Sequence, residues 1–116
     1  MASGIYNRFK ANLMNKIVDL ESDVIKIILL DTNHSFTATN TILTDVSGNE
    51  LAATGGYSTG GNTLGSKAVT EAATTKWDAA DTAWTSATFT AFHAVIYDNT
   101  ATDNLVASID FGGAKT

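Results

Sequence analysis

The fold is decided by one stretch near the C-terminus: Thr85-Ser-Ala-Thr-Phe-Thr-Ala-Phe-His-Ala-Val-Ile-Tyr97, then residues 98–104, then Leu105-Val-Ala-Ser-Ile-Asp-Phe111. Side chains along a strand point alternately to the two faces of a sheet. The first arm is apolar on both faces, which predicts a strand covered on both sides. The second arm alternates between Leu105, Ala107, Ile109 and Phe111 on one face and Val106, Ser108 and Asp110 on the other. We therefore expect a hairpin whose second arm leaves Ser108 and Asp110 in water, with turn formers between the arms.

Other segments predict further strands and the turns between them. Residues 24–30 are β-branched or leucine with little polarity, which favours a central strand. Residues 64–70 and 74–78 predict two more strands, and the glycine pairs within residues 55–61 predict turns or bulges with positive φ. Residues 36–51 predict an irregular loop with a short helical turn near 42–46. Six or seven such strands predict a mainly β fold, an antiparallel β-sandwich.

The N-terminal segment, residues 4–17, has the apolar periodicity of one α-helix. Its stripe is formed by Ile5, Tyr6, Phe9, Leu13, Met14 and Ile17. Ser3 is placed to cap this helix. Two interpretations stay open, because the helix could pack on its own sheet or dock on a neighbouring subunit. The expected organisation is a single domain over residues 1–116, with the helix in 1–18 and the sandwich in 24–116.

The composition argues against several classes of protein. The formal net charge is −5 and the seven basic residues are scattered, which disfavours a surface that follows nucleic-acid phosphates. There is no cysteine, and therefore no disulfide framework or thiolate metal site. No apolar run approaches a membrane span, and the N-terminus lacks the apolar run of a signal peptide. We expect no nucleic-acid or membrane partner, and synthesis in a cytoplasm.

The sequence shows no catalytic or metal-binding constellation. His34 in a predicted turn and His93 on a predicted strand have no nucleophile or carboxylate partner that their spacing suggests. The candidate metal ligands are two carboxylate pairs, Asp78 with Asp81 and Asp98 with Asp103. Neither pair matches the Asp-x-Asp-x-Asp-Gly pattern of a calcium loop, and aspartate is common in turns for backbone reasons. We predict no enzyme activity, no metal and no cofactor.

Three aromatic residues, Tyr57, Trp77 and Trp84, have two interpretations. Flat aromatic rings on a sandwich can form a platform for a sugar. Large aromatic side chains more often anchor a core or a protein interface, because they bury much apolar area with few rotatable bonds. Both interpretations stay open at this point.

Several segments in order carry a resemblance to a known family. They are Ile5-Tyr-Asn-x-Phe-Lys10, Lys26-Ile-Ile-Leu-Leu-Asp31, Gly56-Tyr-Ser-Thr-Gly-Gly61, Ala83-Trp-Thr-Ser-Ala-Thr-Phe-Thr-Ala91, Ala94-Val-Ile-Tyr-Asp98 and Ile109-Asp-Phe-Gly112. With these segments the chain resembles a group of small virion structural proteins of tailed bacteriophages. The resemblance spans nearly the whole chain, and its specificity lies in the order of the segments, since none is a chemical motif.

The resemblance implies a non-enzymatic virion protein, foremost a capsid decoration or cement protein that binds and stabilises the assembled shell. The implied partners are other virion proteins, above all the major capsid protein, and further copies of the chain in a homo-oligomer. Two alternatives stay open: a tail, collar or fibre-base component, and a glycan-binding adhesin module. The candidate interface residues are Ile5, Tyr6, Phe9, Leu13, Tyr57 and Trp84.

Overall fold

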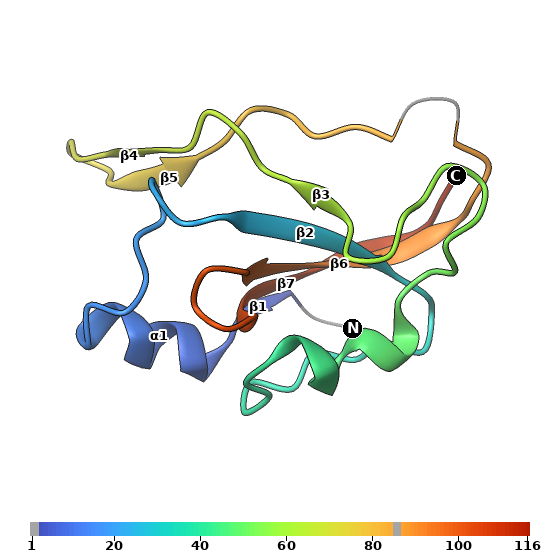
Figure 1. Ribbon diagram of the computed structural model, residues 1–116, viewed down its shortest axis with the longest axis horizontal. Helices are drawn as coiled ribbons and strands as arrows, with labels where there is room; N and C mark the ends of the chain where they lie inside the picture. The colour runs from blue at the N-terminus through green and yellow to red at the C-terminus, as the bar shows by residue number, and fades with distance from the viewer. Residues whose placement is uncertain (1–2, 85–86) are drawn as a thin grey trace.

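The described part of the chain, residues 3–84 and 87–116, forms seven strands in two antiparallel sheets and one α-helix near the N-terminus (Figure 1). In this computed structural model the larger sheet has the order β1-β7-β6-β2-β3, and β4 and β5 form a separate ribbon. The elements are β1 (Gly4–Ile5), α1 (Asn7–Met14), β2 (Ile25–Leu30), η1 (Leu43–Asp45), η2 (Ser47–Asn49), β3 (Asn62–Thr63), β4 (Ala68–Thr70), β5 (Lys76–Asp78), β6 (Ala91–Asp98) and β7 (Asn104–Lys115). The predicted fold class, mainly β and sandwich-like with one helix, is confirmed.

Two central strands, β2 and β6, are covered on both faces. In Figure 1, α1 and the 3₁₀ turns η1 and η2 lie below the larger sheet, and the β4–β5 ribbon with its connections lies above it. The lower core consists of Tyr6, Ile28, Leu30, Val46, Val95, Tyr97 and Leu105. The upper core consists of Leu29, Tyr57, Ala91 and Ala94, with Trp84, Phe89 and Phe111 packed against it. The predicted central strand and doubly covered arm are confirmed, although β6 begins at Ala91, and Thr85 and Ser86 lie outside the described residues.

A bulge in β7 changes which of its residues are buried. The pairing of β6 with β7 shifts by one residue at Val106. Beyond the shift, Ser108 lies opposite Val95 and is buried, whereas Ile109 is 37% exposed. Asp110 follows Ser108 onto the inner face and is partly buried. The prediction that Ser108 and Asp110 face water was wrong, because one inserted residue exchanges the faces of every residue that follows it.

The helix predicted over residues 4–17 was too long at both ends. Gly4–Ile5 instead forms β1 on the edge of β7, and the Tyr6 N–H continues this pairing to a β7 carbonyl at 3.0 Å. Ser3, the predicted cap, accepts the Asp110 N–H through its hydroxyl at 2.8 Å. A free sheet edge offers partners to these backbone groups, which therefore pair as a strand before the helix begins.

The turn predictions from glycine are confirmed. Gly55, Gly56, Gly60 and Gly61 all have positive φ, between 65° and 96°. At Gly61 the chain passes so close to β2 that a Cβ atom would lie 1.9 Å from the carbonyl oxygen of Ile27. The predicted strand pair appears as β4 and β5, both shorter than expected, and η1 lies where the short helical turn was predicted.

Candidate functional site

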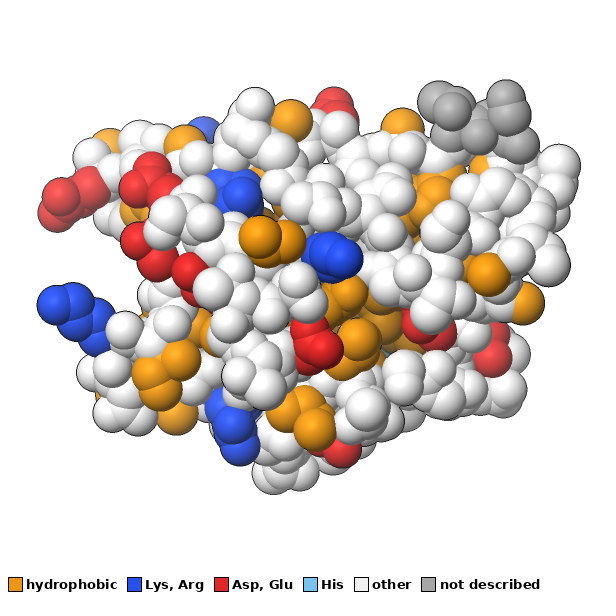
Figure 2. All heavy atoms as spheres, in the orientation of Figure 1, with side chains coloured by type: hydrophobic (Ala, Val, Ile, Leu, Met, Phe, Trp, Pro, Cys, Tyr) orange, Lys and Arg blue, Asp and Glu red, His pale blue; other side chains and the backbone are white. Residues whose placement is uncertain are grey.

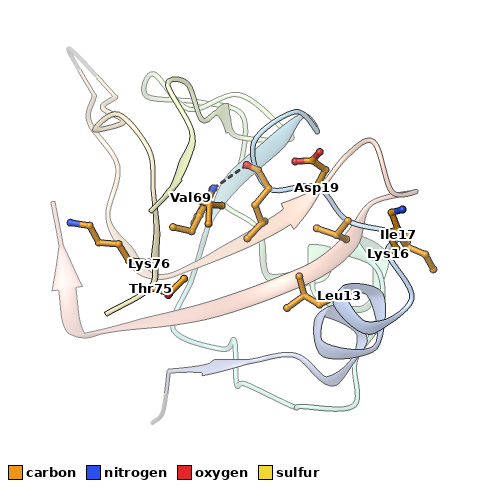
Figure 3. Close-up of a pocket in the computed structure, with 10 residues that line it drawn as sticks. Leu13, Lys16, Ile17, Asp19, Val69, Thr75 and Lys76 are labelled. Carbon is orange, nitrogen blue, oxygen red and sulfur yellow. Dashed lines mark hydrogen bonds between the residues drawn. The ribbon is translucent and has the colours of Figure 1, made fainter. Parts of the chain in front are cut away.

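A groove with a volume of about 590 Å³ lies between the end of α1 and the β4–β5 ribbon. Its apolar lining consists of Leu13, Ile17, Val18, Leu20, Val69 and Trp77, here called the groove surface. Leu13 and Ile17 come from one wall and Val69 from the other, with Lys16, Asp19 and Lys76 among the remaining lining residues (Figure 3). The same region is the notch at the left edge of the molecule in Figure 2.

The groove surface leaves large apolar side chains in water. Leu13, Ile17 and Val69 are each about half exposed, and Met14, next to Leu13 on α1, is 82% exposed. Contiguous exposed apolar area on a small domain is typical of an interaction site, because exposing it to water is unfavourable. This surface is therefore the best candidate for contact with another protein.

Two hydrogen bonds fix the two walls of the groove to each other. The Trp77 indole N–H donates to the Leu20 carbonyl at 2.9 Å, and the Val69 N–H donates to the Glu21 carboxylate at 3.1 Å. Between the walls, the Asp19 carboxylate accepts the N–H groups of Glu21 and Ser22, and hydrogen bonding from Ser22 and then Glu21 lowers its pKa. These bonds hold the β4–β5 ribbon against the segment that follows α1, and thereby shape the groove.

The structure separates the candidate interface residues into two groups. Tyr6, Phe9 and Tyr57 are buried within the subunit, so they belong to its own core and present no surface to a partner. Ile5 and Leu13 are about half exposed, and only Leu13 lies on the groove surface. Trp84 is partly buried against the upper core. One side of the N-terminal helix packs inward through Phe9, as the first interpretation expects, and the other side, with Leu13 and Met14, faces water.

The three aromatic residues considered for sugar binding do not come together. Tyr57 and Trp84 stack at 6.1 Å between ring centroids, with Phe89 edge-on to both, whereas Trp77 lines the groove. The Tyr57 hydroxyl donates to the Glu50 carboxylate at 2.6 Å and accepts the Leu29 N–H at 3.2 Å. Burial and the Glu50 hydrogen bond raise the pKa of Tyr57 far above its usual range. Tyr57 is therefore a core anchor that ties the glycine-rich loop to β2.

The sequence patterns did not predict a polar cluster that lies on the lower face of the sheet. The His34 Nε2 atom lies 3.0 Å from the Ser108 hydroxyl, although these residues are 74 positions apart. The rings of His34 and His93 meet edge to face at 5.1 Å, and His93 Nδ1 lies 3.9 Å from the Asp110 carboxylate. The only signal in the sequence was a histidine among apolar residues of β6, because the bulge that turns Ser108 inward has no local signature.

The serine and histidine of this cluster have the spacing of a nucleophile and a general base. Ser108 and His34 are each only 2% exposed, so in this conformation no substrate reaches the hydroxyl. Burial, and then the neighbouring His93, lower the pKa of His34, which keeps its ring neutral at pH 7. The arrangement therefore fastens the loop that carries His34 to β7.

Asp98 and Asp103, one of the pairs considered as metal ligands, each accept a hydrogen bond from a nearby N–H group. Asp98 is fully buried at the end of β6 and accepts the Ala101 N–H at 3.0 Å, while its second oxygen has no hydrogen-bond partner among the described residues. Burial and the neighbouring Asp23 carboxyl raise the pKa of Asp98 to about 7. Asp103 accepts the Asn99 side-chain amide at 2.7 Å. Within residues 3–84 and 87–116 no three histidine or acidic side chains are arranged to hold a metal ion.

Comparison with known proteins finds no matching family model, no matching curated protein and no matching solved structure. Across the described residues no helix combines the length and apolar character needed to cross a membrane.

The two sides of α1 are expected to differ sharply in their contribution to stability. Phe9→Ala is expected to lower the free energy of unfolding by about 3–5 kcal/mol, because Phe9 is buried against the sheet. Leu13→Ala, on the same helix, is expected to change it by less than about 0.5 kcal/mol, since Leu13 is half exposed. Urea denaturation followed by circular dichroism measures both. Equal losses for the two variants would mean that the groove surface is part of the subunit's own core.

Proposed function

We propose that the protein is a non-enzymatic structural component of a bacteriophage virion, foremost a decoration protein that docks on the assembled capsid shell. The groove surface carries this proposal, because a formed, apolar and exposed groove is suited to an apolar segment of another protein. The sequence resemblance supplies the identity of that protein, the major capsid protein. The buried Ser108–His34 pair supports a non-enzymatic role, since its hydroxyl is closed to substrate.

Docking of this kind stabilises the shell by mass action. A protein that binds the assembled shell and not the free capsid subunit adds RT ln(1 + [L]/Kd) per site, which is about 2.7 kcal/mol at 100 times Kd. Because a shell offers many equivalent sites, weak individual contacts add up over the lattice. Shells that lack this protein are therefore expected to open at lower temperature than decorated shells.

The test is a binding measurement with shells of the phage's major capsid protein assembled without this chain. The double variant Leu13→Ser/Ile17→Ser is expected to bind at least about tenfold more weakly than the wild type, because it removes two exposed apolar side chains from the groove surface. Its melting temperature should stay close to that of the wild type, since both side chains are already about half exposed. Co-sedimentation over a concentration series gives the affinity.

Ile109→Ser is the matched control, because Ile109 is an exposed isoleucine on β7 outside the groove surface. It is expected to bind like the wild type. Equal binding by all three proteins would refute docking through the groove. Absence of binding by the wild type would refute the decoration assignment. Its presence only at the tail or collar of whole particles would favour the tail assignment.

A further inference from the structure

We propose that His34 and His93 form an acid-sensitive latch, which holds the segment of residues 31–49 against β6 and β7 at neutral pH and releases it when the rings take up protons. This segment, here called the latch segment, carries His34 and the side chains of Phe36, Leu43 and Val46 that cover the lower core. The proposal is independent of the groove surface and of the identity of any partner.

The geometry leaves no favourable place for two positive charges. Both residues are at least 97% buried, and their rings meet edge to face at 5.1 Å between centroids. A proton on each ring would place two like charges at this separation away from water, which is unfavourable on both counts. The Ser108 hydroxyl, 3.0 Å from His34 Nε2, is a neutral partner and offsets neither charge.

The acidic groups that face the pair can offset only part of this charge. The Asp110 carboxylate of β7 lies 3.9 Å from His93 Nδ1, and one of its oxygens also accepts the Gly112 N–H. On the latch segment, the Asp31 carboxylate acts on His34 from farther away and accepts the Asn33 N–H at 2.8 Å. The Tyr6 hydroxyl, just before α1, is also near Ser108, and burial raises its pKa. Protonation of His34 therefore has no close counter-charge.

One side of the cluster borders a pocket. A pocket of about 430 Å³ is lined by Thr32 of the latch segment together with His93, Asp110, Gly112 and Gly113. Protons can thus enter from solvent beside His93 without global unfolding. The latch segment also lies outside the β2–β6–β7 ladder, and its backbone bonds to other elements include Leu43 N–H to the Asp103 carbonyl and Asn7 N–H to the Ala38 carbonyl. The β2–β6 and β6–β7 ladders contain no residue of this segment, so on this proposal they stay paired when the segment is released.

The direction with pH follows from the lowered pKa of His34. The unfolded or released state binds a proton more readily than the closed state, so closure is complete above the ordinary histidine pKa of 6.5 and weakens as the pH falls below it. Amide hydrogen exchange measured by NMR between pH 7.5 and pH 4.5 tests this on the wild type. After correction for the intrinsic rate, the amides of Leu43 and Asn7 should lose at least about tenfold protection, while amides of β6 keep theirs.

Two substitutions should move the transition in opposite directions. His34→Gln keeps a polar side chain beside Ser108 but removes one charge, so it should lower the pH of release by about one unit or abolish release. Asp110→Asn keeps an oxygen that can accept the Gly112 N–H but removes the carboxylate near His93, so it should raise that pH. If the side chains of His34 and Asp110 only stabilised the closed structure, both substitutions would raise the pH at which the latch segment is released.

The outcomes that overturn the latch are distinct. Loss of protection in β6 together with the latch segment would mean global acid unfolding, and full protection of Leu43 and Asn7 down to pH 4.5 would mean that no latch exists. A shift in the same direction for both variants would also refute it. If His34→Gln does not fold, the wild-type exchange profile and the Asp110→Asn variant still test whether the latch exists.

Discussion

Replacing Gly61 by alanine is expected to lower the free energy of unfolding by about 2–5 kcal/mol. Gly61 has φ of 72°, a conformation that costs an L-residue roughly 1–2 kcal/mol. The added Cβ would also lie 1.9 Å from the Ile27 carbonyl oxygen, and the backbone of β2 cannot yield as a flexible side chain can. Relieving such a contact costs about 1–3 kcal/mol more. The glycine loop would have to lift away from the central sheet.

The measurement is chemical denaturation of Gly61→Ala beside Gly48→Ala. Gly48 lies in η2 with nothing within 4 Å of the Cβ position and no positive φ, so its replacement should change stability by less than about 0.5 kcal/mol. The loop is further tied down by the Tyr97 hydroxyl, which donates to the Gly60 carbonyl at 2.9 Å. If Gly61→Ala has the same denaturation midpoint as the wild type, this loop does not pass as close to β2 as described.

Asp98→Asn is expected to stabilise the protein at pH 7.5 and above while changing little at pH 4. The carboxyl of Asp98 is fully buried, and burial and the Asp23 carboxyl raise its pKa from the ordinary 3.8 to about 7. Because the folded state holds this proton more tightly than the unfolded state, the stability from Asp98 is complete below pH 4 and is lost as the pH rises towards 7. The loss is at most about 1.4 kcal/mol per pH unit.

Asparagine reproduces the neutral form of Asp98 at every pH and can still accept the Ala101 N–H through its side-chain oxygen. The difference in unfolding free energy between Asp98→Asn and the wild type should therefore grow between pH 4 and pH 7 and then level off. His34 makes stability change with pH in the opposite direction. This contribution is the same in both proteins and therefore cancels in the difference. Asp81→Asn, on an exposed aspartate, serves as the control and should show no such growth. A difference that stays constant across this range would show that Asp98 is ionised throughout.

The sequence by itself determined the features that depend on neighbouring residues. The runs of residues 24–30 and 91–97 are apolar on both faces, and an apolar strand of that kind is stable only with cover on both sides, as β2 and β6 are. The glycine pairs near Tyr57 predicted positive φ because only glycine adopts it without steric cost. The mainly β fold class followed from these local patterns.

Only the tertiary structure decided which residues meet across the chain. The register shift at Val106 turns Ser108 inward, and the pairing of Gly4–Ile5 with β7 replaces the first turn of the predicted helix. The His34–Ser108 contact and the groove between α1 and the β4–β5 ribbon arise in the same way. Strand register and sheet edges are set by competition among distant segments for the same backbone partners, and no local periodicity records the outcome of that competition.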